Sequence, residues 1–345
     1  MRKKRGLLFR ILKWGGLTIV LAVLILVLVA LPYWVADRAT SIGTRPMDLA
    51  LASSPADDGL DFEDASFSAS DGVPLRGWYL GGGDQGVSIV CAHGLFRSRR
   101  EVLDRGVWFR ENGYNVLLMD SRRHGESEGE RATMGFKERL DVEAGIDFMR
   151  EREPDDRIIL FGVSMGAAAS LLAAAERPDV EAVIADSSFL NLEQVVTAYL
   201  ELLARLPRFP LGDMLIFFME QLGGFQREDL NLAEAVRRIG NRPILFLGGS
   251  EDRQVPPDVQ RKLYGVAVSG LSDLVIFEGA GHGAAHRTQT DAYRQALVDF
   301  LTRVDAARPN TVAGSSPSHG FPPSLKLRRG LAEVRPRRGA GANEG

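Results

Sequence analysis

The sequence predicts an α/β protein built on a doubly wound, mostly parallel sheet of eight strands. Eight short runs rich in β-forming residues recur along the chain, and helix-like stretches separate most of them. The later runs are almost wholly apolar, as parallel strands buried on both faces are. Strands that alternate with helices form right-handed βαβ units within one sheet.

The expected strands all lie between residues 62 and 280. The first two are close together and alternate between polar and apolar residues, so we expect an antiparallel hairpin at one edge of the sheet. The strands are "FEDASFSA" (62–69), "LRGWYLGG" (75–82), "VSIVCAHG" (87–94), "NVLLMDSR" (115–122), "RIILFGVS" (157–164), "EAVIADSS" (181–188), "RPILFLGG" (242–249) and "DLVIFEGA" (273–280). The helices span 101–112, 137–152, 165–176 and 286–304.

The amino terminus has the pattern of a membrane anchor. Residues 1–13 carry six basic residues and no acid, and the next 23 residues, Trp14 to Ala36, carry no charge. A helix of that length spans about 35 Å, enough to cross a hydrocarbon core of roughly 30 Å. Tyr33 and Trp34 suit the far interface, and the basic flank favours a cytoplasmic N-terminus with the rest of the chain outside. We expect a single-pass signal-anchor over 1–36; the alternative is a cleaved signal peptide, for which no clean small-residue cleavage site follows.

The remaining chain divides by composition. Residues 37–60 are polar and irregular and are expected to form a spacer, residues 61–304 form the α/β domain, and the Pro-, Gly- and Arg-rich residues 305–345 are expected to be a disordered basic tail. The interval of about 190–241 holds two apolar helix-like stretches, although a single crossover helix is enough to connect the strands on either side of it. We interpret it as a helical lid over the carboxyl ends of the strands, with a long crossover as the alternative.

Composition excludes several classes of partner. Residues 14–304 carry 42 acidic against 29 basic residues, so no nucleic acid is expected as a partner. The single cysteine, Cys91, excludes an intrachain disulfide and a cysteine-built metal site, and we expect neither a metal nor a cofactor. The basic run at 97–100 is interpreted either as a solvated turn or as a contact for an anionic substrate.

The stretch Gly162-Val163-Ser164-Met165-Gly166 follows an expected strand and opens an alanine-rich helix. In that context the pattern predicts a nucleophile elbow. The serine occupies a tight turn, and the flanking glycines are needed because the two sides of the turn approach each other closely. A plain strand-to-helix turn with small residues is the alternative.

Five motifs lie at the ends of expected strands, in chain order: "HG" (93–94), "DSRRHGESEG" (120–129), "GVSMG" (162–166), "GGSEDRQVP" (248–256) and "GAGHG" (279–283). In this order they resemble the α/β-hydrolases over about residues 62–304, and most of all bacterial membrane-anchored serine hydrolases near the serine aminopeptidase and lipase/esterase branch. The resemblance is specific for the fold and for a Ser-acid-His triad. It does not specify a substrate.

The resemblance implies a nucleophile at Ser164, an acid at Asp252 and a base at His282, in the chain order of the family. Glu251 and Asp258 are rival acids, and His286 is the alternative base.

The resemblance also implies an oxyanion hole formed by the backbone N–H groups of Met165 and Leu95, with Phe96 as a substitute for Leu95. His93 is expected to brace the oxyanion loop, and His124 to be structural.

These residues predict a membrane-anchored serine hydrolase that cleaves carboxylic ester, thioester or small amide bonds through an acyl-enzyme, either esterase/lipase-like or aminopeptidase-like. Its partners would be a small-molecule or lipid-like acyl substrate and the membrane. Acyl transfer on the same triad, and a non-catalytic binding module of the same fold, are the alternatives.

Overall fold

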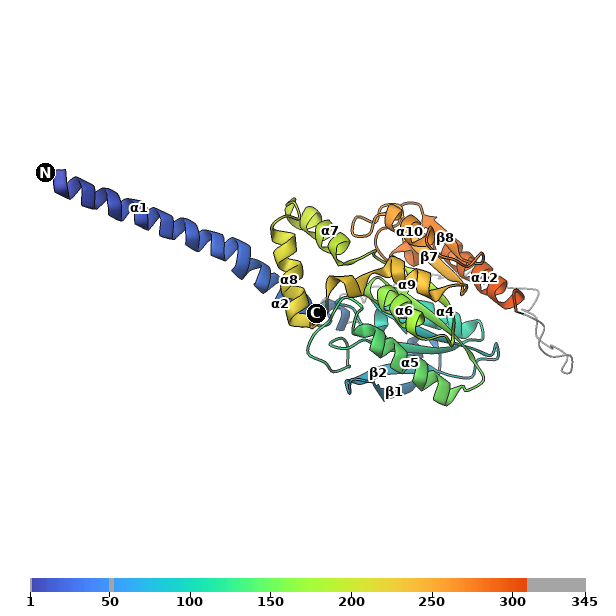
Figure 1. The fold of residues 1–345 in the computed structure, drawn as a ribbon. Helices are drawn as coiled ribbons and strands as arrows, with labels where there is room; N and C mark the ends of the chain where they lie inside the picture. Colours follow the sequence, from blue (N-terminus) through green and yellow to red (C-terminus); the bar gives the residue numbers. More distant parts are fainter. Residues whose placement is uncertain (1, 50–52, 309–345) are drawn as a thin grey trace, which may run out of the picture. The chain divides into compact units, whose positions relative to one another are not determined.

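The computed structural model describes residues 2–49 and 53–308, and its centre is one eight-stranded sheet (Figure 1). The strands lie in the order β1-β2-β4-β3-β5-β6-β7-β8. β2 pairs antiparallel with β1 and β4, and the remaining neighbours are parallel, which confirms the predicted sheet and its edge hairpin. The strands are β1 (Glu63–Ser68), β2 (Pro74–Leu80), β3 (Val87–Ala92), β4 (Asn115–Asp120), β5 (Arg157–Val163), β6 (Val180–Asp186), β7 (Ile244–Gly249) and β8 (Asp273–Phe277).

Two hydrophobic cores lie on the two faces of this sheet, because successive strand side chains point to opposite faces. The helices beyond the amino-terminal region are α4 (Leu103–Glu111), α5 (Glu138–Arg152), α6 (Met165–Glu176), α7 (Leu192–Ala204), α8 (Leu211–Gly223), α9 (Leu232–Ile239), α10 (Pro257–Tyr264), α11 (Ala285–Thr288) and α12 (Thr290–Ala306). In β3, Ile89 and Cys91 pack in the core shared with α4 and α12. Val90 and Ala92 pack in the core shared with α5, α6 and α9.

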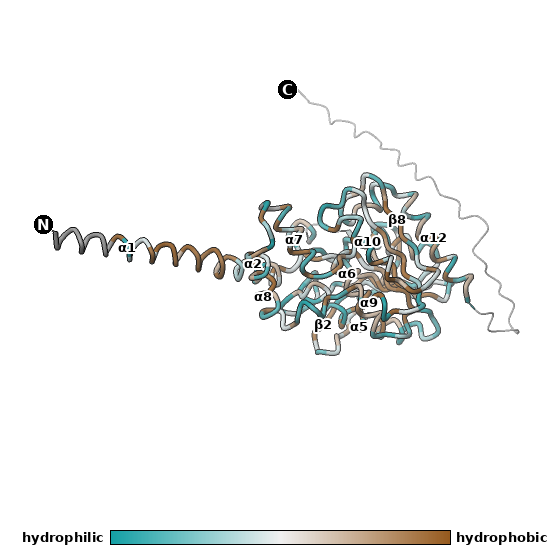
Figure 2. The backbone as a smooth tube through the Cα atoms, turned by 45° about the horizontal axis from the view of Figure 1, so that its top comes forward, coloured by the Kyte–Doolittle hydropathy of each residue, from teal (hydrophilic) through white to brown (hydrophobic). Residues whose placement is uncertain are grey.

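The amino-terminal region is helical from α1 (Arg2–Ile25) through a π-helical turn (Leu26–Ala30) into α2 (Leu31–Ser41). This stretch is long and apolar enough to cross a membrane, and its apolar part stands out in Figure 2. A helix of this kind occurs both in membrane anchors and in signal sequences.

The interval 190–241 contains two different kinds of structure. Its last helix, α9, packs on α6 through buried Leu232, Val236 and Ile239, so α9 is an ordinary crossover helix. Helices α7 and α8 with the loop between them form a separate feature, the α7–α8 insertion, and α8 packs on α2. Within α8, Ile216 is buried and Phe217 is exposed, so the consecutive apolar residues there divide between two faces.

The structure differs from the expected spacer at 37–60. Residues 37–41 complete α2, and short helices follow at α3 (Pro46–Leu49) and Pro55–Asp58. Thr40 and Asp48 are buried. Residues 42–48, the 42–48 strap, lie against residues 96–98 through hydrogen bonds. The tail expected at 305–345 lies outside the described residues from residue 309 onward.

Candidate active site

Ser164 lies between β5 and α6 with φ 53° and ψ −111°, a left-handed backbone conformation that side chains other than glycine rarely adopt. The flanking glycines make this turn possible. A Cβ on Gly162 would lie 2.3 Å from the carbonyl oxygen of Gly166, and a Cβ on Gly166 would lie 2.3 Å from that of Ala92. The two glycines therefore have the steric role that the sequence predicts.

Ser164, His282 and Asp252 come together from the ends of β5, β8 and β7. His282 Nε2 lies 2.9 Å from Ser164 Oγ, and His282 Nδ1 lies 2.7 Å from Asp252 Oδ2. The other carboxylate oxygen of Asp252 accepts hydrogen bonds from the backbone N–H groups of Gln254 and Val255 at 2.9 and 2.8 Å. These two bonds fix the carboxylate of Asp252, which is buried.

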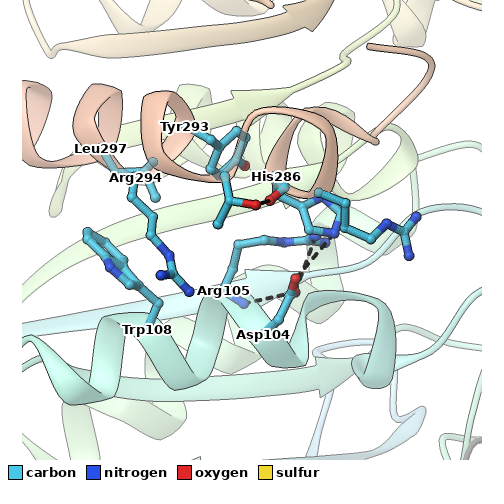
Figure 3. Close-up of a pocket in the computed structure, with 9 residues that line it drawn as sticks. Asp104, Arg105, Trp108, His286, Tyr293, Arg294 and Leu297 are labelled. Atoms are coloured by element: carbon cyan, nitrogen blue, oxygen red, sulfur yellow. Dashed lines mark hydrogen bonds and ion pairs between the residues drawn. The ribbon is translucent and has the colours of Figure 1, made fainter. Parts of the chain in front are cut away.

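The rival residues lie elsewhere. Glu251 is exposed, and Asp258 forms an exposed ion pair with Arg261. His286 lies on α11, where its Nε2 is 3.2 Å from Asp104 Oδ2. It borders a cavity of about 150 Å³ between α4, α11 and α12 (Figure 3). The ring beside the hydroxyl of Ser164 is that of His282.

The environment of His282 favours its protonated form on balance. Burial lowers the pKa of the imidazole, but the hydrogen bond and the charge of Asp252, together with the charges of Asp186 and Glu101, raise it above the ordinary value. The site therefore stabilises the imidazolium that forms when the ring accepts a proton from a neighbouring hydroxyl.

Two backbone N–H groups beside Ser164 are available as donors. Met165 is the first residue of α6, where no intrahelical carbonyl can accept its N–H. The N–H of Leu95 makes no hydrogen bond to any residue that the structure describes, whereas the N–H of Phe96 donates to His124 Nε2 at 3.1 Å. The geometry thus favours Leu95 over Phe96 as the second donor.

The loop that carries Leu95 is braced by side chains. His93 Nδ1 lies 2.7 Å from the carbonyl oxygen of Gly94, and its Nε2 accepts the N–H of Ser121 at 3.1 Å. The N–H of Gly94 donates to Glu101 Oε2 at 2.6 Å. Sequence reasoning missed Glu101, because a single acid at the start of a helix gives no signal of a contact seven residues back.

The 42–48 strap supports the same loop from outside. Thr44 Oγ1 donates to the carbonyl oxygen of Arg97 at 2.7 Å, and the N–H of Arg45 donates to that of Phe96 at 2.9 Å. The guanidinium carbon of Arg45 also lies 5.3 Å from the centre of the Phe96 ring. The residues next to Leu95 are therefore held by the chain that leads from α2.

Asp48 ends this strap with a buried carboxylate. Ser98 Oγ donates to Asp48 Oδ2 at 2.8 Å, and Arg97 Nη1 lies 3.4 Å from Asp48 Oδ1. Arg99 of the same basic run is buried, and its N–H donates to Asp120 Oδ1 at 2.7 Å. Arg97 and Arg99 therefore have partners within the protein, and the guanidinium carbon of Arg100 lies 5.3 Å from the centre of the Trp78 ring.

Asp186, at the end of β6, connects the turn at Ser164 with the loop that carries His282. Its carbonyl oxygen accepts the N–H of Ser164 at 2.8 Å. Its buried carboxylate accepts the hydroxyls of Ser187 and Tyr293, each at 2.9 Å, and Ser187 Oγ in turn accepts the N–H of Gly283 at 3.1 Å. Burial raises the pKa of this carboxyl. Sequence reasoning missed Asp186 as well, since it looks like any strand end.

Comparisons with known proteins agree with this architecture. The family model described as serine aminopeptidase, S33, matches residues 84–217, and the one described as TAP-like protein matches residues 226–313. A polyketide transferase of Stachybotrys chlorohalonatus, ATR5, is 34% identical over 290 residues, which cover 70% of this chain and 97% of that protein. YqkD of Bacillus subtilis is 27% identical over 237 residues, covering 68% of this chain and 77% of that protein.

Among solved structures, an esterase of Pyrococcus furiosus superimposes with a TM-score of 0.61 at 25% identity, covering 73% of this chain and 94% of the esterase. The sheet order, the strand-to-helix turn at Ser164 and these matches lead to one assignment. The chain belongs to the α/β-hydrolase superfamily.

Proposed function

We propose that this chain is a membrane-anchored serine hydrolase that cleaves carboxylic ester, thioester or small amide bonds through an acyl-enzyme. The observation that carries the proposal is the continuous line of hydrogen bonds from Asp252 through His282 to Ser164. The oxyanion loop lies beside the nucleophile, because a Cβ on Gly94 would be 3.5 Å from the Cβ of Ser164.

Each residue has one step in this mechanism. Ser164 Oγ attacks the substrate carbonyl carbon while His282 Nε2 takes its proton. Asp252 holds the tautomer of His282 and stabilises its charge. The N–H groups of Met165 and Leu95 bind the tetrahedral oxyanion, each lowering the barrier by about 3–4 kcal/mol. His282 then protonates the leaving group, and a water molecule, deprotonated by the same ring, releases the acid from Ser164.

Labelling with a fluorophosphonate tests the nucleophile. We expect the full-length protein to be labelled and the Ser164→Ala variant to remain unlabelled. The control is Ser70→Ala, which removes an exposed hydroxyl in the β1–β2 turn and should be labelled as the wild type is. Persistent labelling of Ser164→Ala, or no labelling of a folded wild type, would contradict the proposal; the second result would favour a binding module.

Acyl transfer is a second candidate, and the likeness to a polyketide transferase favours it specifically. The α7–α8 insertion also carries apolar side chains, which would limit the access of water to the acyl-enzyme. The partition of a pre-formed acyl-enzyme between water and an added alcohol separates the two reactions. Acid as the sole product at high alcohol concentration supports hydrolysis, whereas ester as the main product supports transfer.

The anchored state rests on the charge-free stretch and its basic flank, with the N-terminus cytoplasmic and the hydrolase domain extracytoplasmic. Alkaline extraction of membranes combined with sequencing of the mature N-terminus tests it. We expect the protein to stay in the pellet with its basic residues present. A mature chain that begins beyond residue 36, or release into the supernatant, would contradict an anchor.

A further inference from the structure

The α7–α8 insertion exposes bulky apolar side chains. Among the side chains that the structure describes within residues 53–308, six large apolar ones are exposed, and four of these belong to this insertion. These four, the insertion's apolar face, are Leu202 (41% exposed), Leu206 (41%), Phe209 (76%) and Phe217 (45%). Isolated exposed apolar residues are ordinary, but a group confined to one insertion indicates a partner.

The amino-terminal helix fixes where this face lies relative to a bilayer. α8 packs against α2 and against the π-helical turn before it, and the two helices lie side by side in both views (Figures 1 and 2). The Tyr33 ring meets the Phe218 ring edge-on, with centroids 5.4 Å apart. Tyr33 is in the aromatic pair that ends the charge-free stretch, and such pairs mark the boundary between hydrocarbon and headgroups.

This contact places α8 at the same depth as Tyr33. Asp37, the first charged residue after Trp14, follows Tyr33 by four residues, which is about 6 Å of helix. The α7–α8 insertion therefore cannot stand away from the membrane unless α8 separates from α2.

The loop between α7 and α8 has the composition of a segment that lies at a membrane interface. It reads "RLPRFP" over residues 205–210, with two arginines, two bulky apolar residues and no acid. Arg205 is exposed, and Arg208 is bound to Asp213 through its Nη2 at 2.6 Å. Apolar side chains that enter the acyl boundary beside arginines that reach lipid phosphates are typical of an interfacial segment.

The insertion is also linked to Asp252 through Gln254. On α7, Tyr199 Oη donates to Gln254 Oε1 at 2.8 Å, and Gln194 Nε2 donates to the carbonyl oxygen of Gln254 at 2.9 Å. The N–H of Gln254 in turn donates to Asp252. The helix that carries part of the apolar face thus lies next to the proposed acid.

From these contacts we infer that the insertion's apolar face docks into the headgroup–acyl boundary of the bilayer that holds α1, so that the site takes acyl lipids from that bilayer. The inference rests on the proposed anchoring and hydrolase activity. It adds a second membrane contact, made by Phe209 and Phe217, and a substrate class.

Docking is tested by fluorescence on the full-length protein in phosphatidylcholine–phosphatidylglycerol vesicles. Cys91 is buried, so a Phe209→Cys variant can be labelled at one site with an environment-sensitive dye. We expect quenching by nitroxide carried on the lipid acyl chains and protection from aqueous iodide. The control is Val268→Cys, a residue 57% exposed beyond α10, which should show the opposite pattern. Equal iodide quenching at both positions, or protection that depends on protein concentration without nitroxide quenching, would overturn docking.

The substrate class is tested with Phe209→Asp and Phe217→Asp. We expect each variant to hydrolyse a soluble short-chain ester as the wild type does, and to lose at least tenfold in rate on a long-chain ester embedded in the vesicles. Equal rates on the embedded ester would overturn this part. The fluorescence readout needs no turnover, so a docked but inactive protein would refute the proposed hydrolase and leave docking standing.

Discussion

The sharpest test of the proposed site is Gly162→Ala, because one added methyl group meets backbone atoms that cannot move aside singly. The new Cβ would lie 2.3 Å from the Gly166 carbonyl oxygen and 2.5 Å from the Ala167 nitrogen, where ordinary contacts begin at 3.4 Å. The turn would have to open by about 1 Å, and Ser164 would move with it. A misplacement of that size costs on the order of 100-fold in rate, or about 2.7 kcal/mol of barrier.

The assay compares kcat/KM on a short-chain p-nitrophenyl ester with the rate of fluorophosphonate labelling, each normalised to folded protein by circular dichroism. Gly281→Ala is the matched control. It adds the same methyl group next to His282, at a point where no heavy atom outside residues 280–282 lies within 4 Å. We expect Gly281→Ala to retain activity within about threefold, since surface-like sites change free energies by about 0.5 kcal/mol. A folded Gly162→Ala protein that reacts as fast as Gly281→Ala would refute the steric account of the turn.

Three further predictions concern the oxyanion loop, the base and the strap. Leu95→Pro removes the proposed donor and should lower kcat by 10²–10³-fold, whereas Leu95→Ala keeps the N–H and should stay within about threefold in the ester assay; equal losses would rule out a backbone role. The pKa of His282 is raised and its neutral ring is the proposed base, so kcat/KM should fall as pH drops through a value above 6.5. Asp252→Asn should move this fall in kcat/KM to lower pH and reduce the rate by about 10⁴-fold. A pH profile in which the fall is not shifted would argue against the pairing of Asp252 with His282. Asp48→Asn weakens the charged hydrogen bond from Ser98 and should lower kcat by about tenfold with little change in KM, while the exposed Asp84→Asn should change neither; a wild-type kcat in Asp48→Asn would contradict support of the loop by the strap.

The sequence was sufficient for features whose signals are local. Apolar runs separated by helices predicted the strands. The resemblance to the α/β-hydrolases implied Ser164, Asp252 and His282, which the structure brings within hydrogen-bond distance. The glycines at 162 and 166 were interpreted correctly, because a tight turn determines which residues can flank it.

The supporting residues could not be found in this way. Glu101, Asp186 and Asp48 act through contacts with segments that only the tertiary structure brings near them, and none of them belongs to a periodic pattern. The sequence predicts a spacer over 37–60 because that segment is polar and irregular, and the 42–48 strap lies within it. Its backbone and hydroxyl groups find their partners some fifty residues away, in the oxyanion loop.

The contacts of α8 and of the 42–48 strap show that the amino-terminal helical region is packed into the rest of the protein. α2 contacts the α7–α8 insertion on one side and continues into the 42–48 strap on the other. The strap's hydrogen bonds to the oxyanion loop each contribute about 0.5–1.5 kcal/mol, so together they amount to several kcal/mol in a protein whose whole stability is only about 5–15 kcal/mol. A helix that only tethered the domain would need neither set of contacts. Residues 31–48 therefore pack with the α/β domain, and we expect a version of the protein that begins after them to lose the contacts that hold the loop around Leu95.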